Sequence, residues 1–135
     1  MQPSLPLIAK HRRWETFLGE AERAAAAADW SRCTGMVARF VEVLWQRIGA
    51  EERMMVPAIL RSGVHPTRTI AALRRRHGQL AGTLRDMHAA LGAQDADVFI
   101  TSCERLILLL RRHMARAERL AYAVGPVVDG QPLIV

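Results

Sequence analysis

Residues 67–91 of the chain read TRTIAALRRRHGQLAGTLRDMHAAL. Apolar residues recur in this stretch at every third or fourth position, which is the period of an α-helix with one buried face. They are Ile70, Leu73, Leu80, Leu84, Met87 and Leu91. The one other position of this stripe holds a histidine, His77. The stretch predicts an amphipathic helix whose inward face carries a single ionisable residue.

Three further segments show the same period, at about residues 5–28, 31–60 and 97–124. We expect Thr67 to cap the third helix, Pro57 to end or kink the second, and Gly125 with Pro126 to stop the fourth. Four helices of similar length with short links predict an all-α, up-down-up-down four-helix bundle. The bundle should occupy residues 1–126, and residues 127–135 should form an extended tail.

Length and composition favour a single-domain, cytoplasmic protein. The chain of 135 residues is long enough for one domain with its own core. We read Cys33 and Cys103 as reduced packing residues of a cytoplasmic protein, a disulfide between them being the alternative. The N-terminal apolar patch lacks the flanks of a signal peptide. No apolar run reaches the roughly 20 residues needed to cross a bilayer, so we expect no membrane partner.

The charge of the chain is basic. The net charge is +6, and 18 of the 19 basic residues are arginine. Arginines occur in every segment, and no aromatic residues interleave with them as a platform for stacking bases would require. Specific nucleic-acid binding is therefore not expected, whereas an acidic protein partner fits the charge. Either a monomer or a homodimer is compatible with the sequence.

Each of the other three helices also carries one ionisable residue on its inward stripe. These residues are His11, Glu51 and His113. In an antiparallel bundle their positions, with that of His77, reach one level near one end. A lone histidine on a stripe is more often a hydrogen-bonded core residue than a ligand. Four such residues on four helices favour a present or ancestral site for iron, zinc or manganese. His65 and His88 do not fit the stripes, and we expect both at the surface.

Four short motifs resemble the hemerythrin-like, or HHE cation-binding, family. They are LIAKHR at 7–12, EERMMVP at 51–57, Arg76-His77, and HMARAERLAY at 113–122. Their order and spacing cover nearly the whole chain as far as Pro126. The resemblance implies a hemerythrin-like bundle that binds non-haem iron. It also implies sensing or handling of oxygen, peroxide or nitric oxide, or oxidative chemistry, and it leaves open whether the protein is an enzyme.

The chain departs from that family in two ligands. The family typically holds two irons, bridged by carboxylates that each lie four residues after a histidine. This pattern places histidine at position 47 and an acid at position 117 or 118, where the chain has Arg47, Ala117 and Glu118. A guanidinium group cannot ligate a metal.

Two interpretations follow from these departures. In the first, the metal ligands are His11, Glu51, His77 and His113, with Glu118 as a further candidate. They form a reduced, mononuclear site for iron, or else zinc, open to a small diatomic or peroxide ligand. In the second, Arg47 pairs with Glu51 and supplies the charge of the missing metal. The chain is then a metal-free pseudo-hemerythrin that serves as a regulatory or partner-binding module.

Overall fold

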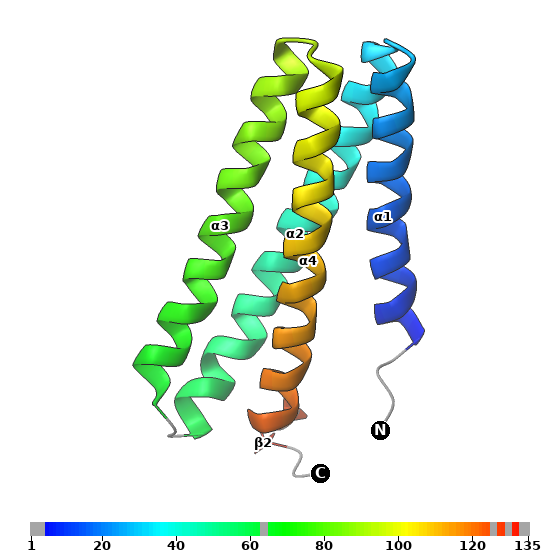
Figure 1. The fold of residues 1–135 in the computed structure, drawn as a ribbon. Coiled ribbons are helices and arrows are strands. Elements are labelled where there is room, and N and C mark those ends of the chain that lie inside the picture. The colour runs from blue at the N-terminus through cyan, green and yellow to red at the C-terminus, as the bar shows by residue number, and fades with distance from the viewer. Residues whose placement is uncertain (1–4, 63–64, 125–126, 129–130, 133–135) are drawn as a thin grey trace.

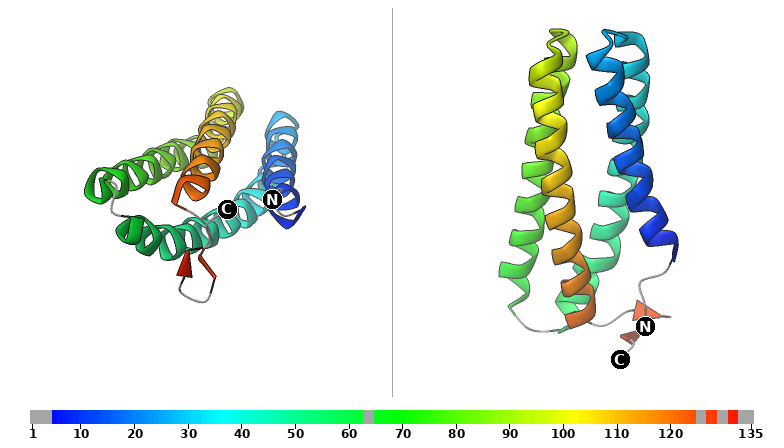
Figure 2. Two further views of the ribbon diagram at one scale, coloured as in Figure 1. Left: turned by 90° about the horizontal axis from the view of Figure 1, so that it is seen from below. Right: turned by 45° about the vertical axis from the view of Figure 1, so that its right-hand side comes forward.

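A computed structural model gives the structure of the chain. The model describes the backbone of residues 5–62, 65–124, 127–128 and 131–132, and the side chains of residues 14–62 and 65–123. The helices in chain order are α1 (Leu5–Ala26), α2 (Trp30–Ser62), α3 (Pro66–Gly92) and α4 (Ala96–Val124). Each helix packs against the next, and α4 returns to pack against α1 (Figures 1 and 2). The predicted all-α, up-down-up-down four-helix bundle is confirmed.

The α1–α2 and α3–α4 links have the same construction. Ala28 and Gln94 adopt left-handed backbone conformations, with φ of 56° and 53°. The following residues, Asp29 and Asp95, each donate a backbone N–H to a carbonyl five residues back, as in a Schellman motif. The carboxylate of each aspartate then accepts the N–H three residues ahead at 3.2 Å. One residue pair thus ends one helix and starts the next, which keeps the helices adjacent and antiparallel.

Pro57 does not end α2. The helix continues to Ser62 with Pro57 inside it. Proline removes one backbone hydrogen bond from a helix interior, which favours a break there. Here Ile59, two residues later, is fully buried in an apolar cluster. The burial of Ile59 offsets the lost hydrogen bond.

Thr67 does not cap α3. The helix begins one residue earlier, at Pro66, and His65 takes the capping position with φ of 44°. Proline suits the first helical position because its fixed φ is already helical and its missing N–H would have had no partner there. The backbone carbonyl of His65 accepts the Thr69 hydroxyl at 2.9 Å. His65 and His88 are both exposed, as expected.

The C-terminal region contains a short hairpin. Strand β1 (Val127–Val128) pairs antiparallel with β2 (Gln131–Pro132). The expected stop at Gly125 and Pro126 lies outside the described residues. Among the helices described, none combines the length and the apolarity that a bilayer-spanning segment needs.

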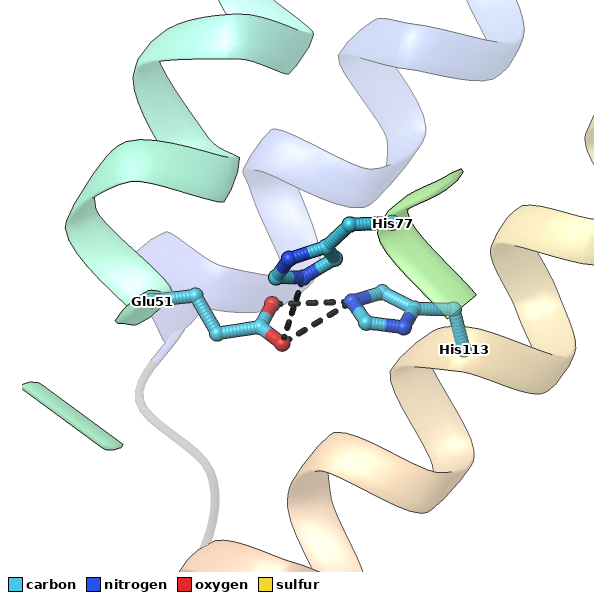
Figure 3. Close-up of side chains that lie close together, drawn as sticks. All are labelled: Glu51, His77 and His113. Atoms are coloured by element: carbon cyan, nitrogen blue, oxygen red, sulfur yellow. Dashed lines mark hydrogen bonds and ion pairs between the residues drawn. The ribbon is translucent and has the colours of Figure 1, made fainter. Parts of the chain in front are cut away.

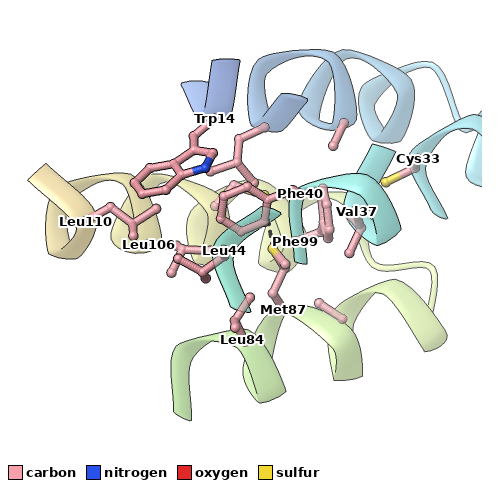
Figure 4. Packing of buried hydrophobic residues seen from close by; sticks show 14 of the residues in the cluster. Trp14, Cys33, Val37, Phe40, Leu44, Leu84, Met87, Phe99, Leu106 and Leu110 are labelled. Carbon is pink, nitrogen blue, oxygen red and sulfur yellow. Dashed lines mark hydrogen bonds between the residues drawn. The ribbon is translucent and has the colours of Figure 1, made fainter. Parts of the chain in front are cut away.

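Buried apolar side chains form two clusters with a polar layer between them. The larger cluster surrounds Phe40 and Phe99 and includes both cysteines, which are free (Figure 4). The smaller cluster consists of Met55, Ile59 and Leu73. On α2 the sequence passes from Ile48 in the larger cluster to Met55 in the smaller, and Glu51 lies between them; His77 on α3 and His113 on α4 lie between the clusters in the same way. The ionisable residues therefore occupy one layer of the bundle.

Candidate metal centre

Three helices bring Glu51, His77 and His113 to one point. Each side chain offers a ligand atom, and these atoms lie within 4.8 Å of one another (Figure 3). His113 Nε2 lies 2.9 Å from one carboxylate oxygen of Glu51 and 3.0 Å from the other. His77 Nε2 lies 3.4 Å from Oε1 of Glu51, which is the oxygen 2.9 Å from His113 Nε2. Two imidazole nitrogens and a carboxylate thus converge in the protein interior, where His77 is 6% and His113 5% exposed.

Glu52 holds the outer side of the His77 ring. Its carboxylate oxygen lies 2.8 Å from His77 Nδ1. A carboxylate at one ring nitrogen fixes the ring orientation and directs the other nitrogen towards a metal. The inward stripe of α2 predicts no role for Glu52, because a residue one position after Glu51 points about 100° away around the helix. Its adjacency to a predicted ligand was the only signal available.

Hydrogen bonds favour the charged forms of Glu51 and His77 in the cluster. Burial favours the neutral form of Glu51, but hydrogen bonds from His113 and His77 outweigh burial and lower the pKa of Glu51 to about 2. Burial also disfavours a charged His77, but hydrogen bonds to Glu51 and Glu52 raise the pKa of His77 above its usual 6.5. The cluster therefore combines a carboxylate with an imidazole that binds a proton readily. A metal ion would take the place of that proton.

His11 and Glu118 are the other predicted ligands. The backbone of His11 lies in α1, which packs against both α2 and α4, but its side chain lies outside the described residues. Glu118 is exposed and does not join the three converging side chains. It lines a neighbouring pocket together with Ala117. Among the four candidates whose side chains the structure describes, it thus brings three together.

Arg47 takes a different position from the one that the metal-free interpretation requires. Its guanidinium carbon lies 5.2 Å from the ring centroid of Trp14, the geometry of a cation–π contact. Within the described residues, the ion pairs of Glu51 are with His77 and His113. Burial lowers the pKa of Arg47, and the charges of Glu51 and Glu118 partly oppose this effect. Arg47 thus acts on Glu51 as a nearby charge.

A pocket leads to the carboxylate from the side of α1, α2 and α4. Its volume is about 440 Å³. Its lining is mostly apolar and includes Trp14, Val43, Met54, Met55, Met114, Ala117 and Ala121, with Gln46, Arg47, Glu51 and Glu118 as polar members. The pocket gives a small molecule a route to one face of the cluster.

A comparison with protein families identifies the bundle. The model of the hemerythrin HHE cation binding domain matches residues 6–124. Neither the curated proteins nor the solved structures yielded a match to this chain. The matched range covers the four helices except for Leu5, and it includes the Glu51, His77 and His113 cluster. The chain therefore belongs to the hemerythrin HHE cation-binding family and carries a candidate metal site in its core.

Proposed function

We propose that the chain binds a single non-haem metal ion, iron in preference to zinc, through Glu51, His77 and His113, with His11 as a fourth ligand. The observation that carries this proposal is the direction of the two histidine rings. Both Nε2 atoms face the Glu51 carboxylate, and Glu52 occupies the other nitrogen of His77. We further propose that the site senses or handles oxygen, peroxide or nitric oxide, or supports oxidative chemistry.

The three donors fit this metal. Two histidines and one carboxylate that leave coordination positions open are typical of non-haem iron(II) sites. The low pKa of Glu51 keeps the carboxylate charged and ready to bind a cation. A bound metal would supply a Lewis acid at which a small ligand is activated. The protein residues would fix the donors, and the proton that leaves His77 would be released to solvent.

The residues around Glu51 favour one metal over two. Arg47 and Ala117 replace the two further donors that a second ion would need. The Arg47 guanidinium is permanently charged, and its charge acts on Glu51. A second cation beside Glu51 would be repelled by it. Arg47 thus supplies, beside Glu51, the positive charge that a second metal ion would otherwise bring.

The apolar pocket suits small, weakly polar ligands. Met54, Met55 and Met114 line it, and methionine side chains are apolar and adaptable.

Nitric oxide added to the iron(II)-loaded chain tests whether a small ligand reaches the metal through this pocket. Binding should change the optical spectrum, and an unchanged spectrum would exclude access of such ligands to the metal.

Glu52→Gln tests the proposed site through a residue that does not touch the metal. The amide keeps the size of the side chain but loses the charge that orients His77 Nδ1. Loss of such a partner lowers metal affinity by about 10- to 100-fold. Anaerobic iron(II) titration of the wild type and of the variant measures the change. Glu42→Gln is the matched control, because Glu42 is an exposed acid of the same helix. Equal affinity in all three proteins would contradict the proposed site.

The metal-free chain should be most stable within a range of pH and should lose stability at both lower and higher pH. Glu51 has its pKa lowered from 4.5 to about 2, so its stabilising contribution is present above pH 4.5 and is lost as the pH falls towards 2. His77 has its pKa raised above 6.5, so its contribution is present below pH 6.5 and is lost as the pH rises through the raised value. Together these two contributions are greatest between these limits.

Metal should remove the alkaline part of this dependence, because it binds the neutral imidazole. Melting temperatures measured across pH, with and without zinc, check both effects. His77→Gln lacks the titrating ring and should lose the alkaline decline without any metal. A wild-type melting temperature that stays constant from pH 6 to pH 9 would contradict the assigned state of His77.

A further inference from the structure

A second hollow lies on the opposite side of the cluster, between α3 and α4. We call it the arginine groove, and its volume is about 640 Å³. Arg76 and Arg85 line it from α3, and Arg112 and Arg116 line it from α4. Asp86 is the one acid among its described lining residues. The groove therefore has a strong local excess of positive charge.

The four arginines of the groove form no ion pair with any described residue. Arg76 Nε is buried and has no hydrogen-bond partner among the described atoms. Arg76 and Arg116 thus line the same hollow from two neighbouring helices.

A histidine nitrogen also faces this groove. His113 is 5% exposed and belongs to the lining of the arginine groove. Its Nε2 atom faces Glu51, and Figure 3 shows Nδ1 on the side of the ring turned away from that carboxylate. In the described part of the chain, Nδ1 is buried without a hydrogen-bond partner. A buried polar atom without a hydrogen-bond partner is costly, so a ligand that supplies such a partner is favoured.

We propose that the arginine groove binds a small oxyanion, either inorganic phosphate or the phosphoryl group of a small phosphoester. Arg76 and Arg116 supply the inner guanidinium groups, whose planar geometry matches phosphate oxygens in pairs. His113, whose Nδ1 has no hydrogen-bond partner among the described atoms, forms part of the inner wall, and the Thr83 hydroxyl lies in the same lining. This proposal does not depend on the metal, since the groove and its charges are present in the metal-free chain.

Calorimetric titration of the purified chain with inorganic phosphate at low ionic strength tests the groove. The double variant Arg76→Gln/Arg116→Gln should bind phosphate at least about tenfold more weakly, since it loses two charge-assisted hydrogen bonds. Arg39→Gln/Arg68→Gln is the matched control. Both arginines are exposed and lie outside the groove, and the double substitution removes the same amount of charge. An equal loss in both double variants would reduce the effect to nonspecific attraction and overturn the proposal.

Nitrogen-15 spectra of the histidine rings provide the second readout. Phosphate should shift the Nδ1 resonance of His113 in the metal-free chain and leave exposed His88 unchanged. Parallel titrations with glycerol phosphate and with phosphate distinguish an ester from the free ion by their affinities. Phosphate binding without a shift at His113 would overturn the assignment, as would an absence of binding by both ligands. A chain that binds phosphate but no metal would leave this inference standing and remove only the proposed metal site.

Discussion

The His77→Ala variant should fold as a bundle and lose its metal. The substitution removes one of the three converging donors and, among the described residues, leaves His113 as the imidazole partner of Glu51. Loss of an orienting neighbour already costs about 10- to 100-fold in metal affinity, so loss of a ligand should cost more than about 100-fold. Elemental analysis of the purified variant and circular dichroism measure the two outcomes separately.

Two further variants sharpen this test. His77→Gln keeps most of the side-chain volume but removes the imidazole ring, and it should also be metal-free. His88→Ala removes an exposed histidine from the same helix and should retain the wild-type metal content. Full metal content in either position 77 variant would show that His77 is a core residue and not a ligand.

Phe99→Ala should cost about 3–5 kcal/mol of unfolding free energy, the range for loss of a buried aromatic ring. Phe99 is fully buried and makes an edge-on contact with Trp30, with ring centroids 6.5 Å apart. The loss is large against a total stability of roughly 5–15 kcal/mol. Urea denaturation of the metal-free chain measures it.

Leu108→Ala is the matched control for this prediction. Leu108 lies on the same helix but is 53% exposed, so its loss should change stability by at most about 0.5 kcal/mol. Phe99 lies 14 residues before His113, or about 21 Å along the helix, and any folded Phe99→Ala protein should therefore bind metal normally. Equal destabilisation by the two variants would contradict the assigned core.

Periodicity predicted most of the fold. The spacing of apolar residues identified the four helices and their inward faces, because burial of one face is a local property of sequence. Helix ends were less predictable. At Pro57 the proline disfavours the helix, yet the burial of Ile59 depends on packing with other helices. Tertiary burial of this kind is not visible in a single segment.

The candidate site was predictable in part for the same reason. Glu51, His77 and His113 interrupt the inward stripes, so their convergence followed from the helical period and the antiparallel arrangement. The role of Glu52 depends on how α2 and α3 pack, and the period alone could not show it. Arg47 has a long side chain with several rotamers. Its position over Trp14 follows from contacts between helices and not from its distance to Glu51 along α2.

The arginine groove was visible in the sequence only as excess charge. Arg76 belongs to a run of three arginines, and Arg112 and Arg116 lie one turn apart on another helix. Nothing in their spacing says that the two helices bring them to one hollow beside His113. Long-range packing creates that site.

The number of metal ions per chain distinguishes a mononuclear site from a di-iron site and from a metal-free core. Elemental analysis of the protein purified from iron-supplied cells, without metal added during purification, gives this number. We predict one ion per chain, with iron preferred, and its loss in His77→Ala. Two irons per chain would contradict the roles assigned to Arg47 and Ala117, and a protein that neither contains nor takes up metal would contradict the site as a whole.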